Sequence, residues 1–290
     1  MISIHAPGGI GEITPETDLA AVIVEACADG EIGGLRDGDI LVVTSKIISK
    51  QEGRTFPAEE KLALRRREST RTVARKLGTA IVATHHGLVQ AAAGIDASNV
   101  TSGVILALPV DPDASAAALR TALHELTGAR VGVIISDTAG RAWRIGQTDH
   151  AIGCAGVRPL LSYSGEVDAY GNELRVTLTA IADELAAAAD LAKTKLAGRP
   201  VALLRGLAEH VVDAGEPART IARPVDEDLF SHGAREAVLA AILATVGASE
   251  RYEELVDLDE PGDVVAALGL TTTEAEWAGR VLAAGYGMFG

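Results

Sequence analysis

The sequence predicts a mixed α/β fold of the α+β kind, because strand-like and helix-like segments do not alternate strictly along the chain. Short β-branched apolar runs, such as 40–44 and 131–136, are typical of buried strands. Ala-rich segments with acids near the start and lysines near the end, of which 181–196 is the clearest, are typical of helices. Aromatic residues make up only 3% of the 290 residues, so the core must be built from Ala, Val, Leu and Ile.

The elements of the first hundred residues follow from apolar runs and capping residues. Thr17 or Asp18 can cap the first helix, and Gly30 can end it. The charged stretch after residue 58 has apolar residues at helical spacing, which favours an exposed helix. The predicted elements are strands at 2–4, 40–44 and 81–84, a Gly-rich turn at 7–11, and helices at 19–28 and 59–77.

The second part of the chain is interpreted in the same way. Asp113 or Ser115 can cap a helix that Gly128 ends. Residues 140–156 are rich in Gly and polar groups and lack a clear period, so an ordered loop is predicted there. The predicted elements are strands at 104–108, 131–136, 174–179 and 201–204, and helices at 113–126, 181–196 and from 232 to the end.

The composition limits the classes of function. With 26 basic and 40 acidic residues the net charge is −14, which argues against a nucleic-acid-binding protein because such proteins need a basic face. A nucleotide ligand stays compatible, since backbone amides and metal ions can hold phosphates. Cys27 and Cys154 lie in no zinc motif, and we find no signal peptide or membrane-spanning run. We therefore expect a reduced cytoplasmic protein that does not bind membranes.

The segment after the predicted strand 131–136 has the densest cluster of chemically useful side chains. Asp137 and Thr138 can present a carboxylate and a hydroxyl to Mg²⁺ or Mn²⁺. Arginine matches phosphate and carboxylate groups, so we expect Arg141 and Arg144, with Asp149, to bind or position a substrate. A purely structural role explains this density poorly.

Three further segments are weaker signals by themselves. Residues 8–13 form a Gly-rich turn that fits neither the Rossmann nor the Walker A pattern. Residues 44–50 bring hydroxyl and ammonium groups to the end of a buried strand, and 94–99 place Asp, Ser and Asn in one turn. Each could be an ordinary turn or surface stretch, but together they indicate a site for phosphate and a divalent cation.

These segments resemble the coenzyme F420-0:L-glutamate ligase family, in particular the ligase half of the actinobacterial bifunctional enzyme. The resemblance covers about residues 2–245, and Gly11 stands where relatives have Pro. It implies a domain at 1–245 with largely antiparallel sheets in an intertwined homodimer, and a helical extension at 246–290 without the nitroreductase-like domain of the bifunctional enzyme. The motifs that carry it are long and irregular: 37–54, 87–100, 108–116, 137–149 and 170–174.

The resemblance also implies a reaction. GTP would phosphorylate the terminal carboxylate of F420-0, and the amine of L-glutamate would displace phosphate from the acyl phosphate to form F420-1. Further γ-linked glutamates would then be added. Two divalent cations, Mg²⁺ or Mn²⁺, would offset charge at the transferred phosphoryl group, and the resemblance allows for a K⁺ ion.

Site residues are carried over by position. Asp96 and Asp137 would bind one metal ion and Thr138 the second, with Glu209 as a further metal ligand. The nucleotide contacts implied are Ile10, Gly11, Glu12, Ile13, Ser45, Lys50, Asn99, Arg205 and Gly206. Two alternatives stay open from the residues alone: a metal-dependent phosphohydrolase that acts on a nucleotide, and a non-catalytic nucleotide-binding module.

Overall fold

The computed structural model describes residues 1–28, 30–76 and 78–289, and the chain folds as two compact units. Unit 1 comprises Met1–Lys61 and Gly94–Ala222, and unit 2 comprises Leu62–Ala93 and Arg223–Gly290. Each unit is therefore assembled from segments that are distant in sequence. The predicted domain boundary between 245 and 246 lies inside unit 2.

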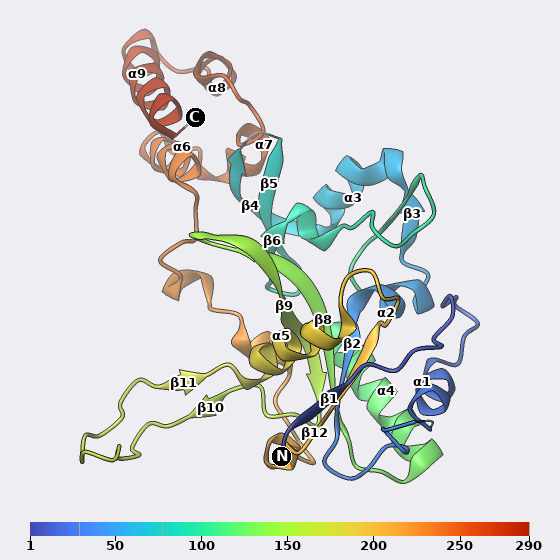
Figure 1. Cartoon of the computed structure of the whole chain (residues 1–290). Helices are drawn as coiled ribbons and strands as arrows, with labels where there is room; N and C mark the ends of the chain where they lie inside the picture. The colour runs from blue at the N-terminus through green and yellow to red at the C-terminus, as the bar shows by residue number, and fades with distance from the viewer. Residues whose placement is uncertain (29, 77, 290) are drawn as a thin grey trace. The chain divides into compact units, whose positions relative to one another are not determined.

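The centre of unit 1 is a mostly antiparallel five-stranded sheet (Figure 1). The only parallel pair in this sheet is β2 with β8, in which Thr44 lies beside Ser136. This agrees with the predicted mixed α/β class and its antiparallel sheets. The strand order is β1 (Ser3–His5), β12 (Val201–Arg205), β2 (Ile40–Thr44), β8 (Gly132–Arg141) and β9 (Arg144–Ala155).

Helices cover the two faces of this sheet. On one face, α5 (Ile181–Lys193) packs its Ala-rich side against alternate strand residues that include Ile40, Val42 and Ile134. The other face receives α4 (Pro112–Thr127), whose first residue lies so close to Gly153 on β9 that a Cβ there would overlap it. Burial of both faces explains why β2 and the first half of β8 are continuous apolar runs.

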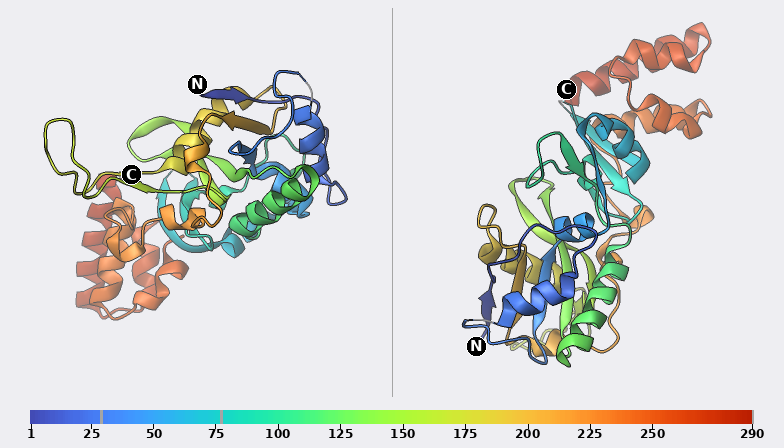
Figure 2. Two further views of the ribbon diagram at one scale, coloured as in Figure 1. Left: turned by 90° about the horizontal axis from the view of Figure 1, so that it is seen from below. Right: turned by 90° about the vertical axis from the view of Figure 1, so that its right-hand side faces the viewer.

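The smaller elements of unit 1 lie around the sheet. Asp18 caps the first helix by accepting from the Ala21 N–H, and Asp111 caps α4 in place of the predicted Asp113 or Ser115. Figure 2 shows α1 beside α4, and the segment with β10 and β11 extending away from the sheet. These elements are α1 (Leu19–Ala28), α2 (Ser45–Gln51), β3 (Thr55–Pro57), β7 (Val104–Leu106), β10 (Leu161–Ser162) and β11 (Leu178–Thr179).

Unit 2 combines a three-stranded antiparallel sheet with a helical cluster. The helices share an apolar core that includes Leu239, Leu255, Val264 and Leu282. None of the described helices is long and apolar enough to cross a membrane. The elements are α3 (Lys61–Glu68), β4 (Ser69–Lys76), β5 (Thr79–Thr84), β6 (Val89–Ala91), α6 (Ala234–Thr245), α7 (Tyr252–Leu255), α8 (Pro261–Leu268) and α9 (Thr272–Phe289).

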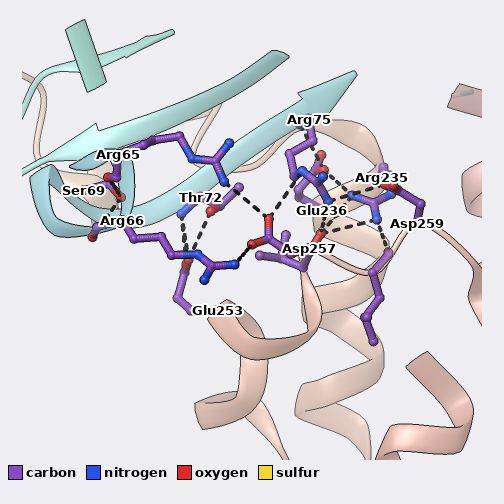
Figure 3. A network of polar contacts seen from close by, with 12 residues as sticks. Arg65, Arg66, Ser69, Thr72, Arg75, Arg235, Glu236, Glu253, Asp257 and Asp259 are labelled. Carbon is purple, nitrogen blue, oxygen red and sulfur yellow. Dashed lines mark hydrogen bonds and ion pairs between the residues drawn. The ribbon is translucent and has the colours of Figure 1, made fainter. Parts of the chain in front are cut away.

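Polar contacts join the C-terminal helices to β4 within unit 2 (Figure 3). The buried carboxylate of Glu236 accepts from the backbone N–H of Arg75 at 3.1 Å, and Glu253 accepts from that of Thr72 at 2.9 Å. Asp257 lies between three guanidinium groups, those of Arg65, Arg66 and Arg75. The last helices thus supply the hydrogen-bond acceptors for one edge of β4.

Three predictions of element type or extent differ most clearly from the structure. The helix predicted over 59–77 ends at Glu68, and β4 follows; residue 77 lies outside the described residues. The loop predicted at 140–156 is mostly β9, because pairing with β8 imposes an extended backbone on a Gly-rich sequence. The strand predicted at 174–179 is reduced to Leu178–Thr179.

Candidate functional site

The site lies in the unit 1 sheet where the pairing of β2 with β8 ends, since β2 stops at Thr44 while β8 continues to Arg141. Because the two strands are parallel and Thr44 is opposite Ser136, Ser45 and Asp137 leave the paired segment together. The Ser45 hydroxyl donates to Asp137 Oδ1 at 3.0 Å. Helix α2 begins at Ser45, so its first residues lie at this point of the sheet.

Asp96 reaches the same region from another segment. Its backbone N–H and C=O bond to Leu106 of β7, which fixes the turn that carries it. The Lys46 ammonium lies 2.5 Å from Asp96 Oδ2, and Ser98 donates to the same carboxylate through its backbone N–H and its hydroxyl. Asp137 and Asp96 are therefore held by consecutive residues, Ser45 and Lys46.

The two carboxylates differ in their electrostatics. Burial raises the pKa of Asp137 to about 6, and the neighbouring charge of Asp149 adds to this effect. Burial also opposes ionisation of Asp96, but hydrogen bonds from Lys46 and Ser98 outweigh it and lower the pKa of that carboxyl. A cation beside Asp137 would therefore relieve an unfavourable charge.

A third carboxylate, that of Asp149, lies near Asp137. Asp149 accepts hydrogen bonds from the hydroxyls of Ser136 and Thr138, at 2.8 and 2.7 Å. Lys193, the last residue of α5, donates to Asp149 at 2.8 Å and to Ser136 at 2.9 Å. Because an ionised carboxylate only accepts hydrogen bonds, the hydroxyl hydrogen of Thr138 points to Asp149, and its oxygen lone pairs are left for another partner.

A cavity of about 490 Å³ adjoins these residues. Its wall is more basic than acidic, although the whole chain carries a net charge of −14. Anionic ligands are therefore favoured in this cavity. The charged side chains that line it are Lys46, Lys50, Lys193, Lys195, Arg199, Glu12, Asp149 and Asp190, and Ile10, Gly11, Asn99 and Thr138 line it as well.

The predicted nucleotide-binding residues are thus largely gathered in one place. Lys50 pairs with Glu12 at 2.6 Å, which links α2 to the Gly-rich turn. Asn99 lines the cavity from a left-handed backbone conformation with φ of 58°. Ile13 is buried and lines an adjoining cavity of about 860 Å³, which shares Gly11 and Glu12 with the first.

The structure does not bring Arg205, Gly206 and Glu209 together with Asp96 and Asp137. Strand β12 runs antiparallel to β2, so Arg205 lies near the start of β2, whereas Ser45 follows its end. The five residues of β2 lie between these two positions, which are therefore roughly 20 Å apart along the strand. The Arg205 guanidinium is engaged by Asp39, with two contacts of 2.8 Å, and a Cβ on Gly206 would overlap the Met1 carbonyl.

Arg141 and Arg144 lie at the exposed turn of the β8–β9 hairpin, where they are opposite each other. They are not among the described residues that line the basic cavity.

Sequence reasoning missed the contacts that Lys46 and Lys193 make with carboxylates of the site. Lys46 lies in a segment that had been singled out, but the position of Lys193 at a helix end indicated only a favourable dipole interaction.

Comparison with known proteins identifies the family. A family model described as F420-0:Gamma-glutamyl ligase matches residues 9–63 and 56–206. The chain belongs to the F420-0:gamma-glutamyl ligase family. Asp96, Asp137, Lys50 and the cavity-lining turn at 10–12 all fall within the part that the F420-0:gamma-glutamyl ligase model matches.

Several curated relatives of this F420-0:gamma-glutamyl ligase family member are named coenzyme F420:L-glutamate ligase. The coenzyme F420:L-glutamate ligase of Methanothermobacter thermautotrophicus is 36% identical over 249 residues, which cover 79% of this chain and 98% of the relative. That of Archaeoglobus fulgidus is 42% identical over 216 residues, 67% of this chain and 84% of the relative. That of Methanosarcina mazei is 37% identical over 221 residues, 70% and 87% of the two chains.

The oxygen donors of this F420-0:gamma-glutamyl ligase family member fit a hard divalent cation. Asp96, Asp137 and Thr138 offer carboxylate and hydroxyl oxygens, which Mg²⁺ and Mn²⁺ prefer. Among the described residues, no three His, Cys, Asp or Glu side chains form a complete metal-binding group. Such a site suits Mg²⁺, which often keeps waters and takes substrate phosphate oxygens beside one or two carboxylates.

Proposed function

We propose that this protein is a GTP-dependent ligase that joins L-glutamate to the terminal carboxylate of coenzyme F420-0. The observation that carries the proposal is that Asp96 and Asp137, distant in sequence, are held by Ser45 and Lys46 beside a basic cavity. Relatives named coenzyme F420:L-glutamate ligase match this chain over most of their length, which supports the choice of substrates.

The basic cavity is the proposed site for the nucleotide phosphates. Lys50 and the backbone of the turn at 10–13 would hold them, and Ser45 and Asn99 would fix the nucleotide further. The Lys50 ammonium group can bind a phosphate either together with Glu12 or in place of Glu12. These residues bind and orient the nucleotide.

The proposed cation ligands are Asp96 and Asp137 for one divalent ion and Thr138 for a second. Divalent ions supply charge neutralisation at the transferred phosphoryl group when they are bound. Asp149 accepts the hydroxyl hydrogen of Thr138 and so turns the oxygen of that hydroxyl outward. Lys193 holds Asp149 in this position.

The proposed reaction has two steps, phosphorylation of F420-0 and transfer to L-glutamate. A carboxylate oxygen of F420-0 attacks the γ-phosphorus of GTP, the bond to the β-phosphate oxygen breaks, and GDP leaves with an acyl phosphate formed. The neutral amine of L-glutamate then attacks the acyl carbon, phosphate leaves, and the nitrogen loses one proton. Phosphorylation is needed because a free carboxylate has no adequate leaving group. Repetition on the new γ-carboxylate would give the polyglutamylated product.

Other expectations from the sequence stay predictions. Arg141 and Arg144 are proposed to bind substrate carboxylates, whereas Arg205, Gly206 and Glu209 receive no role at this site because β12 ends at the opposite edge of the sheet. We also propose that the protein is a homodimer and that it is cytoplasmic. Size-exclusion chromatography with light scattering would test the homodimer. Residues 246–290 are proposed to be a helical extension of the ligase.

Mass spectrometry tests the reaction directly. The purified chain would be incubated with F420-0, GTP, L-glutamate and Mn²⁺, with matched samples that contain ATP, no glutamate or no metal. We expect the deazaflavin to gain one glutamyl residue only in the complete GTP sample, followed by further additions. Replacing K⁺ by Na⁺ in the buffer tests the potassium requirement.

Two outcomes would contradict the ligase. Release of phosphate from GTP without any change in deazaflavin mass would favour the metal-dependent phosphohydrolase. Binding of GTP with neither hydrolysis nor transfer would favour a nucleotide-binding module. An active preparation of an archaeal relative under the same conditions is the positive control.

A further inference from the structure

The Lys46 ammonium is paired with Asp96, one of the two carboxylates that we propose as metal ligands. Its Nζ lies 2.5 Å from Asp96 Oδ2 and 2.5 Å from the Ser98 hydroxyl. The Lys46 side chain is 13% exposed, so this contact is partly shielded from water, which strengthens the attraction. Lys46 also lies close enough to Asp137 to favour the ionised form of that carboxyl.

Lys46 differs from the other paired lysines of the cavity. Lys50 is paired with Glu12, which is 74% exposed, and Lys193 is buried with Asp149. Only Lys46 among these three contacts one of the carboxylates that we propose as metal ligands. It also lines the basic cavity, so its ammonium group has an anion-binding space beside it.

We propose that Lys46 is an exchangeable cation: it neutralises Asp96 while no divalent ion is bound and turns into the basic cavity when the ion binds. This inference rests on the proposed function, because it takes Asp96 as a metal ligand. Lys46 and the divalent ion compete for the same carboxylate oxygen. The ammonium group that is released then adds positive charge where the nucleotide phosphates are proposed to bind.

The exchange has a thermodynamic consequence. Competition by Lys46 lowers the affinity of the empty protein for the divalent ion. A bound nucleotide would stabilise the released ammonium, so nucleotide and divalent ion would each increase the affinity for the other. The free protein would then bind the divalent ion more weakly than the nucleotide-bound protein does.

Metal titration without nucleotide tests this exchange. Mn²⁺ binding would be measured by calorimetry and by electron paramagnetic resonance for the wild type, Lys46→Met and Lys195→Met. Lys195 lines the same cavity, so both variants lose one positive charge from its wall. We expect Lys46→Met to bind Mn²⁺ about tenfold more tightly than the wild type and Lys195→Met to change the affinity by less than about twofold.

The possible results are distinguishable from failure of the proposed function. Unchanged or weaker Mn²⁺ binding in Lys46→Met, with clear binding by the wild type, would overturn the exchange and leave the cation site intact. An equal gain in both variants would also overturn it, because general charge would then be the cause. Absence of Mn²⁺ binding in all three proteins would overturn the cation site itself, and the exchange with it.

A second readout uses the unmodified protein. Lysine acylation with a water-soluble active ester, mapped by peptide mass spectrometry, reports how accessible each ammonium group is. We expect saturating Mn²⁺ to increase the labelling of Lys46 relative to Lys195 in the same sample, because Lys46 leaves Asp96. Unchanged relative labelling under conditions where Mn²⁺ is bound would overturn the proposal.

Discussion

Lys193 and Asp149 form an ion pair of 2.8 Å whose side chains are only 5% and 4% exposed. Burial by itself would raise the pKa of Asp149, but the charge of Lys193 and hydrogen bonds from Lys193, Thr138 and Ser136 lower it. The pair joins the end of α5 to β9 and also contacts Ser136 and Thr138, the neighbours of Asp137 on β8. Lys193 and Asp149 are therefore important for the stability of the protein as well as for the orientation of the Thr138 hydroxyl.

Replacement of Lys193 should be strongly destabilising. In Lys193→Met the Asp149 carboxylate is left buried without its counter-charge, and we expect a loss of about 3 to 5 kcal/mol in the free energy of unfolding. Urea denaturation at neutral pH would measure it, with the exposed Lys195→Met as control. The double variant Lys193→Met/Asp149→Leu should recover most of the loss, and a single variant as stable as the wild type would contradict the buried pair.

The raised pKa of Asp137 predicts how the metal-free protein responds to pH. The pKa of Asp137 in the folded state, about 6, exceeds the usual 3.8, so the folded state keeps the proton of this carboxyl up to a higher pH than the unfolded state does. This stabilisation is complete below about pH 4 and is lost as pH rises to about 6. We expect Asp137→Asn to be more stable than the wild type at pH 8, by about 1 to 3 kcal/mol, and nearly equal at pH 4.

Urea denaturation with a chelator present would measure this difference at both pH values. Comparison of the variant with the wild type cancels the titration of other groups. A wild type that is more stable than Asp137→Asn at pH 8 without metal would contradict the prediction. Addition of Mn²⁺ should stabilise the wild type and leave Asp137→Asn almost unchanged.

Although Asp137→Asn should stabilise the metal-free protein at pH 8, it should lower the catalytic activity. We expect Asp137→Asn to reduce glutamyl transfer by about a hundredfold or more, because the proposed cation loses a charged ligand. Asp213→Asn is a matched control, since that side chain is 87% exposed and its one ion pair within the described residues is a 4.0 Å contact with Arg130. Full transfer activity in Asp137→Asn would exclude it as a metal ligand and favour a structural role.

The two carboxylates that bind β4 should differ in their contribution to stability. Glu236 is 1% exposed and also pairs with Arg235 at 2.9 Å, whereas Glu253 is exposed. Glu236→Ala leaves the Arg75 N–H and the Arg235 guanidinium without this acceptor, and we expect a loss of about 2 to 4 kcal/mol. Glu253→Ala should cost clearly less, because water can replace the exposed carboxylate.

Thermal denaturation and hydrogen exchange would compare these variants. Exchange at the β4 amides should increase most in Glu236→Ala, since this carboxylate protects the backbone of that strand. Equal losses in the two variants would mean that burial of the acceptor is unimportant. Glu254→Ala, which removes a surface pair with Arg251, serves as the control and should leave stability unchanged.

Local sequence was sufficient for the elements whose patterns are strong. The apolar run of β2 and the Ala-rich helix α5 have their predicted types and nearly their predicted ends, since burial against the sheet requires those patterns. Strand β9 was missed because its extended form depends on pairing with β8. Strand β4 was missed because its arginines and threonines imitate the exposed side of a helix.

The site was predictable only where the strands that carry its residues run in the same direction. Placing useful residues at the ends of the predicted strands grouped Ser45 with Asp137. The two do lie together because β2 and β8 are parallel, although β8 itself continues past Asp137 to Arg141. The same reasoning grouped Arg205 with them, but β12 is antiparallel to β2 and ends at the opposite edge. Strand direction within a sheet is a tertiary property, and no local pattern in the 201–205 run encodes it.

Unit 2 has a consequence for biosynthesis, since β4 is translated long before the helices that bind its edge. Ribosomes must add more than half of the chain after Lys76 before Glu236 and Glu253 emerge. During that interval the N–H groups of Thr72 and Arg75 lack these acceptors, and an unpaired strand edge can recruit other chains. We therefore expect stalled or C-terminally shortened nascent chains to depend on chaperones far more than the finished protein does.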